Sequence, residues 1–198
     1  NNNYLRNGLP VSNYAPVALE NKERIEVLKG VAGLQAGVSA PGGLVNFVTK
    51  APLADAFTTA SIAGDGNGGS KLHLDHNTHW GNTGVRVNLA AEDLRTVFDH
   101  AEGKREFASV ALANQTSGST KLSMDFEYHH KKQPSVPGLG LLDTNGDGVA
   151  DSLPASNYAR LNLNNQSWSQ PFEATSTAAQ FAIDQRLGAQ WQGRFSAG

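Results

Sequence analysis

After Pro52 the chain alternates apolar and polar side chains with a period of two residues, which is typical of β-strands with one apolar and one polar face. The run from Val85 to Ala91 is a clear case. Further runs lie near 122–128, 181–183 and 191–195, and weaker ones at roughly 56–64, 69–79 and 104–113. The pattern predicts about seven strands of about ten residues, longer than is usual in a soluble sheet and long enough for a tilted strand to cross a bilayer.

The connections between these predicted strands are unequal. The segment 95–102 is of medium length, and 133–171 is long and rich in Pro, Gly, Asn, Asp and Ser. Short turns are predicted near 65–69, 80–83, 114–119 and 187–189. If the strands alternate in direction, the longer connections share one end with 65–69, and the other short turns lie at the opposite end. This arrangement is typical of outer-membrane β-barrels, while a soluble β-sandwich with one long insertion stays open as an alternative.

Composition narrows the function classes. The 198 residues carry 16 Lys and Arg against 18 Asp and Glu, so no nucleic-acid partner is expected. The absence of Cys excludes disulfides, thiolate zinc sites and thiol nucleophiles from these residues. No apolar run is long enough for a transmembrane helix. We find no nucleophile elbow, zinc-protease motif or convincing carboxylate pair, so the sequence favours a protein that is not an enzyme.

The first fifty residues have a different pattern, with short apolar runs separated by glycines. The run 23–30 fits a strand or a short helix, and Pro41-Gly42-Gly43 predicts a turn before a strand at Leu44–Thr49. The chain opens without a signal-peptide pattern and ends inside a predicted strand at 190–197. We therefore expect it to be a fragment of a longer protein.

Three runs in this region carry a resemblance to a known family: NNYLRNGL at 2–9, ERIEVLKG at 23–30 and APGGLVNFVTKAP at 40–52. They resemble the C-terminal half of the plug of TonB-dependent outer-membrane siderophore receptors, most closely the ferric-hydroxamate, ferrichrome-like kind. The resemblance implies a mainly all-β transmembrane β-barrel of about 22 strands with an N-terminal α+β plug in its lumen. It implies the C-terminal part of the plug in 1–52, the first barrel strands in 53–198, and a long extracellular loop at 133–171.

The resemblance also implies a function. A receptor in the bacterial outer membrane would bind a ferric siderophore above the plug, with no cofactor besides this cargo. Its partners would be outer-membrane lipid and TonB, whose inner-membrane energising complex would move the plug and open a path. Another cargo, such as cobalamin, haem or an oligosaccharide, stays open, as does a secreted, calcium-stabilised β-sandwich adhesion module.

Two groups of plug residues are candidates for these roles. Charged side chains between a polar plug and a polar barrel wall would be paired and would hold the plug in place, unless they belong to an ordinary solvated strand edge. These charges are Glu23, Arg24, Glu26 and Lys29. An extracellular plug loop of the family lies between the Gly8-Leu9 turn and this strand, which makes Ser12, Asn13 and Tyr14 candidate ligand contacts.

The segment 143–151 has the spacing of a calcium loop. Asp143, Asn145 and Asp147 place oxygen ligands at alternate positions, and Asp151 stands at the ninth position. The twelfth position is Pro154 and not the bidentate Glu, which excludes a full EF-hand. The segment therefore predicts either a Ca²⁺ site that stiffens the loop or a solvated Asn/Asp/Gly turn.

Overall fold

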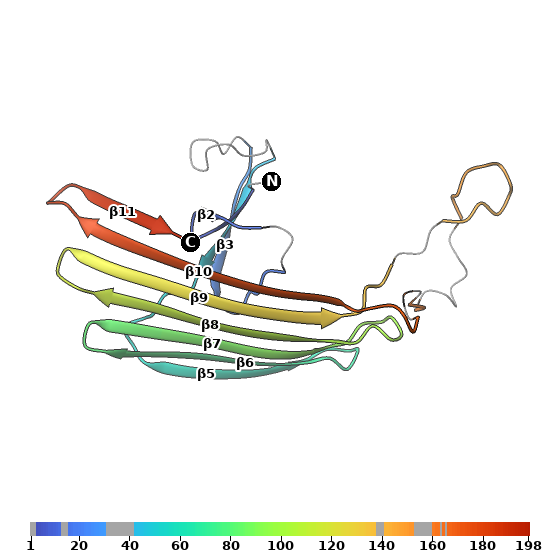
Figure 1. Ribbon diagram of the computed structural model, residues 1–198, viewed down its shortest axis with the longest axis horizontal. Coiled ribbons are helices and arrows are strands. Elements are labelled where there is room, and N and C mark those ends of the chain that lie inside the picture. Colours follow the sequence, from blue (N-terminus) through green and yellow to red (C-terminus); the bar gives the residue numbers. More distant parts are fainter. Residues whose placement is uncertain are drawn as a thin grey trace.

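The structure is a computed structural model that describes residues 3–12, 16–30, 42–137, 141–152, 160–162, 164 and 166–198. The described strands form two sheets, a small one of four strands and a large one of seven (Figure 1). The small sheet consists of β1 (Tyr4–Arg6), β2 (Leu9–Pro10), β3 (Lys22–Leu28) and β4 (Leu44–Thr49). The large sheet consists of β5 (Phe57–Gly64), β6 (Ser70–Trp80), β7 (Thr83–Leu94), β8 (Gly103–Gln115), β9 (Thr120–Gln133), β10 (Phe172–Arg186) and β11 (Gln192–Ala197).

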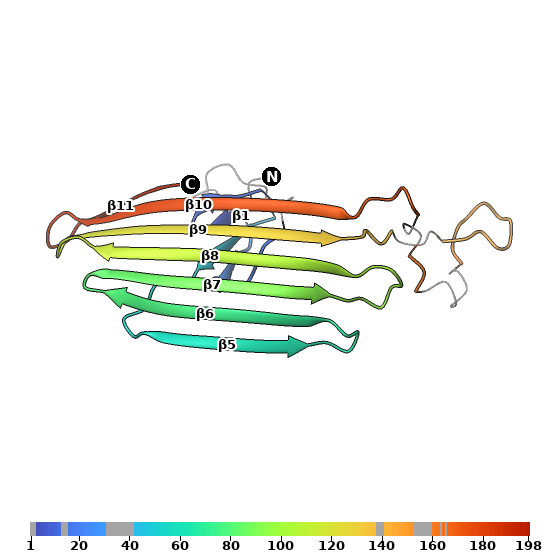
Figure 2. The ribbon, with the colours of Figure 1, turned by 60° about the horizontal axis from the view of Figure 1, so that its bottom comes forward.

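The large sheet is antiparallel throughout, and each strand pairs with its neighbours in sequence (Figure 2). The predicted strands and their connections are confirmed. The connections 65–69, 95–102 and 134–171 lie at one end of the sheet, which we call the long-loop end. The turns 81–82, 116–119 and 187–191 lie at the other end, the short-turn end.

The two faces of the large sheet differ in polarity because the side chains alternate along each strand. On the outer face apolar side chains are exposed in a band that crosses the sheet, and these include Leu72, Leu89, Val110, Met124, Phe126 and Phe195. On the inner face polar side chains are buried, and these include Asp75, Asn77, Arg86, Asn88, Ser109 and Gln180. An apolar outer face and a polar inner face are the pattern of a barrel wall in a membrane.

The small sheet has the order β2-β1-β4-β3, with β1 parallel to β4 and β3 antiparallel to it. Asn7 and Gly8 both have positive φ and join β1 to β2, as the tight turn of an antiparallel pair requires. The segment 23–30, for which the sequence allowed strand or helix, is mainly the strand β3. The regular elements in the described part of 1–52 are all strands, so its expected α+β character is not seen within these residues. No helix among the described residues is long and apolar enough to span a membrane.

The small sheet lies against the inner face of the large sheet (Figures 1 and 2). A short linker after β4 leads directly into β5, and it runs along the inner face because Asn77 hydrogen-bonds the backbone of Leu53 and Asp55. A few small and aromatic side chains, Ala18, Ala90 and Phe107, form an apolar cluster between the two parts. Most of the contact is polar.

Candidate functional site

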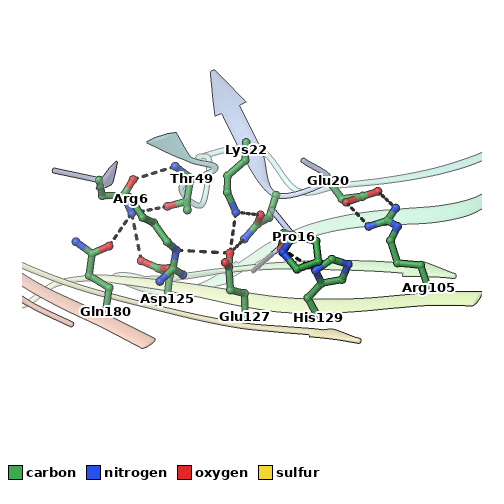
Figure 3. Close-up of polar contacts among 12 residues, drawn as sticks. Arg6, Pro16, Glu20, Lys22, Thr49, Arg105, Asp125, Glu127, His129 and Gln180 are labelled. Atoms are coloured by element: carbon green, nitrogen blue, oxygen red, sulfur yellow. Dashed lines mark hydrogen bonds and ion pairs between the residues drawn. The ribbon is translucent and has the colours of Figure 1, made fainter. Parts of the chain in front are cut away.

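The contact between the two sheets is a set of buried ion pairs and hydrogen bonds, and Figure 3 shows its main members. The residues from the small sheet and its flanking segments are Arg6, Asn7, Glu20, Asn21, Lys22 and Lys50. Their partners lie on the inner face of strands β6–β10. Three clusters can be distinguished along this interface.

The first cluster joins β1 and β3 to β9 and β10. The Arg6 guanidinium forms a hydrogen-bonded ion pair with Asp125. Lys22 donates to Glu127 over 2.7 Å, and the side chains of Arg6 and Lys22 are almost fully buried. Asn7 Nδ2 donates to Gln180 Oε1 over 3.0 Å. Buried charges of this kind are tolerated because each has a partner of opposite sign.

The second cluster is built around Glu20, whose side chain is only 2% exposed. Its carboxylate pairs with Arg105 on β8 and with Lys71 on β6, the latter at 2.5 Å. Arg105 also donates from Nε to Glu92 over 2.7 Å. Burial of Glu20 favours its neutral form, but the hydrogen bonds from Arg105 and Lys71 outweigh burial and lower the pKa of Glu20 to about 2.

The third cluster fixes the end of the small sheet and the linker to β6 and β7. Asp75 accepts two hydrogen bonds from Arg86, at 2.9 and 2.8 Å, and one from Lys50 at 2.8 Å. Arg86 also donates to the backbone carbonyl of Ala51 over 3.1 Å. The amide of Asn77, whose side chain is fully buried, makes three hydrogen bonds to the linker backbone.

A fourth, smaller contact involves His129 on β9. Its Nδ1 donates to the carbonyl oxygen of Pro16 over 3.0 Å, and its ring lies edge-on to Phe107. His129 therefore holds the segment that precedes Glu20 against the large sheet (Figure 3).

The charges that the sequence singled out on β3 and directly after it do not take part in these clusters. Glu23, Arg24, Glu26 and Lys29 are exposed. Arg24 and Glu26 pair with each other at 2.8 Å, and Asn46 also donates to Glu26. The hydrogen bonds from Asn46 and Arg24 lower the pKa of Glu26. The hypothesis that these four charges hold the plug stays a prediction.

Of the candidate ligand contacts, only Ser12 belongs to the described residues. It lines a cleft of about 570 Å³ between the small sheet and β10, together with Val11 and Val17. Asn13 and Tyr14 lie outside the described residues, so their role stays a prediction.

The calcium interpretation of 143–151 is not supported. Among the described residues, which include Asp143, Asn145, Asp147 and Asp151, no group of three or more His, Asp or Glu side chains is placed to hold a metal ion. The Asp143 carboxylate instead accepts the backbone N–H groups of Gly148 and Gly146, at 2.9 and 2.7 Å, and these bonds lower the pKa of Asp143. The segment forms the solvated turn that the sequence left open.

Curated relatives of the chain are named as receptors. The metal-pseudopaline receptor CntO of Pseudomonas aeruginosa is 34% identical over 114 residues, which cover 56% of this chain and 16% of the relative. The catecholate siderophore receptor Fiu of Escherichia coli K12 is 29% identical over 144 residues, 72% of this chain and 18% of the relative. A probable TonB-dependent receptor, BfrD of Bordetella pertussis, is 31% identical over 126 residues, 59% of this chain and 17% of the relative. No protein-family model matches.

Solved structures agree with these relatives. The ferripyoverdine receptor of the Pseudomonas aeruginosa outer membrane matches with a TM-score of 0.83 and 21% identity, over 98% of this chain and 26% of that chain. The open form of Escherichia coli Fiu matches with a TM-score of 0.80 and 21% identity, over 98% of this chain and 31% of that chain. The chain has the fold of part of a TonB-dependent outer-membrane receptor. The fold class expected from the sequence is thereby confirmed, and the β-sandwich alternative is not supported.

We call the small sheet with its flanking segments the plug, and the large sheet the wall, after the parts of TonB-dependent receptors that they resemble. This chain spans only 16–18% of the length of these curated relatives. The wall residues of the ion-pair clusters were visible in the sequence as polar positions of alternating strands. Their plug partners were missed because nothing in a single sequence pairs Arg6 with Asp125, which lies 119 positions away.

Proposed function

We propose that this chain is the part of a bacterial outer-membrane receptor that contains the end of the plug, at 1–52, and the first barrel strands, at 53–198. The receptor takes up ferric siderophores. The observation that carries the proposal is the buried, charge-paired contact between the small sheet and the polar inner face of a wall whose outer face is apolar. A contact of this kind fills the lumen of a barrel and closes it to solutes while leaving hydrogen bonds that can be exchanged for water.

The cargo is assigned from the relatives. Their names refer to metal-pseudopaline, ferric-pyoverdine and catecholate siderophores, all of which are metal complexes of small chelators. Such a complex brings its own metal ligands, so the receptor needs polar and aromatic contacts and no metal-binding cluster of its own. The ferrichrome-like part of the resemblance stays a prediction, because these relatives are named for other siderophore classes.

The energy for transport is assigned to TonB. The long-loop end would face the outside, and the short-turn end would face the periplasm, as in outer-membrane barrels. The outer membrane has no ion gradient of its own, so an inner-membrane complex acting through TonB would move the plug. The chain is a transporter and not an enzyme in this proposal.

Uptake of iron-55 in complex with a siderophore tests the proposal. Cells of the source bacterium should accumulate the label from at least one of a pyoverdine, a catecholate or a hydroxamate complex. Deletion of the receptor should abolish that uptake, and collapse of the proton gradient should abolish uptake while leaving surface binding. Deletion that leaves the uptake of all three complexes unchanged contradicts the proposal.

A further inference from the structure

Two clefts lie between the plug and the wall, on opposite sides of one contact. The cleft toward the long-loop end, of about 570 Å³, is lined by Arg6, Glu127 and the first half of β10. The cleft toward the short-turn end, of about 450 Å³, is lined by Asn7, Asp125 and the second half of β10. Gln180 lines both clefts. The same few side chains therefore separate the two spaces.

We call this separating contact the latch, and it consists of Arg6, Asn7, Asp125 and Gln180. Arg6 is ion-paired with Asp125 (Figure 3). Asn7 donates to Gln180 over 3.0 Å. On β9, Glu127 lies on the long-loop side of the latch, and Lys121 and Ser123 lie on the short-turn side. On β10, residues 175–179 line the cleft on the long-loop side, and Ala182 and Asp184 line the cleft on the short-turn side. Parting the latch would thus join the two clefts along the inner face of β9 and β10.

The plug is held more completely on its other side, at β6 and β7. The Asn77 amide uses its oxygen and its nitrogen on the linker backbone. Arg86, which pairs with Asp75 within the wall, donates to the backbone carbonyl of Ala51 in the linker. Lys50 adds a further bond to Asp75. Each of these buried groups would lose a satisfied hydrogen bond if the linker left the wall, and leaving such groups unpaired costs about 1–3 kcal/mol each.

The β9–β10 side is less well satisfied. Among the described residues, three buried side-chain nitrogens have no hydrogen-bond partner, and all three belong to contacts with β9 or β10: Arg6 Nε, Gln180 Nε2 and His129 Nε2. The first of them, Arg6 Nε, lies 3.5 Å from Glu127 Oε2 in an ion pair. Two of them are in the latch itself. Gln180 Nε2 already bears the cost of burial without a bond. The linker after β4 also joins the plug covalently to β5, so the plug can part from β9 and β10 while it stays attached at β6 and β7.

We infer that the cargo passes along the inner face of β9 and β10, and that transport parts the latch while the contact at β6 and β7 stays closed. This inference rests on the proposed function and adds the route to it. It assigns Asn7 and Gln180 as the residues that close the route, with the linker at 50–55 as the hinge on which the plug moves.

Paired cysteines in the full receptor, in its own outer membrane, test the route. These 198 residues contain no Cys, so introduced pairs can be bridged selectively by a short bismaleimide once any Cys elsewhere in the receptor is replaced by Ser. One receptor carries Asn7→Cys with Gln180→Cys across the latch, and the matched control carries Lys50→Cys with Asp75→Cys across the hinge side. Each bridged receptor is compared with its own unbridged form for iron-55 uptake and for surface binding of the same siderophore complex.

The latch bridge should reduce uptake to the level of cells without receptor and leave surface binding unchanged. The hinge bridge should leave both uptake and binding at the level of its unbridged form. Uptake that survives the latch bridge, or that is lost with either bridge, overturns the inference. Absence of siderophore binding in the unsubstituted receptor would instead contradict the proposed function.

A second measurement does not depend on cross-linking. Asn7→Ala combined with Gln180→Ala should join the clefts and raise the passive permeation of a hydrophilic antibiotic too large for porins. The exposed variant Glu102→Gln, in the connection 95–102, should leave permeation at the level of the unsubstituted receptor. The outer-membrane amount of each variant is measured alongside to show that it has folded. Unchanged permeation in a folded double variant overturns the inference.

Discussion

Glu20 is a plug residue that is buried between two strands of the wall. Its carboxylate is buried and faces two cations, Arg105 and Lys71, which come from different strands of the wall. Removing this one charge would leave Arg105 buried beside Glu92 alone. By contrast, Glu26 pairs with Arg24 in solvent, where a pair contributes little.

Glu20→Gln should therefore destabilise the docking of the plug by about 3 kcal/mol, the cost of breaking a buried pair by removing one partner. Hydrogen exchange of the full receptor in detergent should be faster across 16–30 in this variant. Glu102→Gln, at an exposed position in the connection 95–102, serves as the control and should exchange like the unsubstituted receptor. Equal exchange in all three proteins would show that the Glu20 pairs do not hold the plug.

The same residue predicts a dependence on pH. The pKa of Glu20 falls from its ordinary value of 4.5 to about 2 in the folded protein, so its pairs stabilise the plug fully above pH 4.5. That contribution is lost as the pH falls from 4.5 toward 2, because the carboxylate then takes up a proton. Thermal unfolding of the receptor should show a steeper loss of stability in this window than the Glu20→Gln variant does. Parallel curves for the two proteins would be evidence against the assignment.

The strands of the wall are the elements that the sequence predicts best. Each strand alternates apolar and polar residues because one face meets an apolar surrounding and the other meets a polar plug. Every second residue lies on the same face, so the alternation can be read from the local sequence alone. Leu89 and Thr83 show this on β7: both point to the outer face, one mid-strand and one near the short-turn end.

Leu89→Arg should lower the stability of the folded receptor by about 2–4 kcal/mol, because an Arg near the bilayer midplane is costly, whereas Thr83→Arg near the interface should cost little. Urea unfolding of the receptor in phospholipid vesicles measures both variants. A Leu89→Arg receptor as stable as Thr83→Arg would mean that this face of β7 does not meet lipid.

Other elements were beyond prediction from one sequence. The local sequence of β3 is compatible with a strand or a helix. It is a strand because its backbone hydrogen-bonds to β4, and no local pattern encodes that pairing. The turn at 143–151 has the oxygen spacing of a calcium loop, but the Asp143 carboxylate accepts hydrogen bonds from the backbone N–H groups of Gly146 and Gly148. The clusters at Glu20 and Arg6 depend on pairs distant in sequence, for which alternation predicts a polar face but no partner.

The whole molecule combines a small sheet that makes mainly polar contacts with a large sheet that has one apolar and one polar face. The wall requires an apolar surrounding on its outer face, and its inner face requires the plug, because Asp125 and Glu127 would otherwise lose their cationic partners. The chain covers about a quarter of the ferripyoverdine receptor, 26% of its length. We propose that one contact, between plug and wall, both closes the barrel and opens it at β9 and β10.

The most direct test is to extract the native protein that contains this chain from membranes of its source and to measure its location and intact mass. We predict recovery in the outer-membrane fraction, solubility only in detergent, and a mass several times the 21.0 kDa of this chain. A mature soluble protein of 21.0 kDa would contradict the assignment to an outer-membrane receptor, because its apolar outer face would then have no lipid to meet.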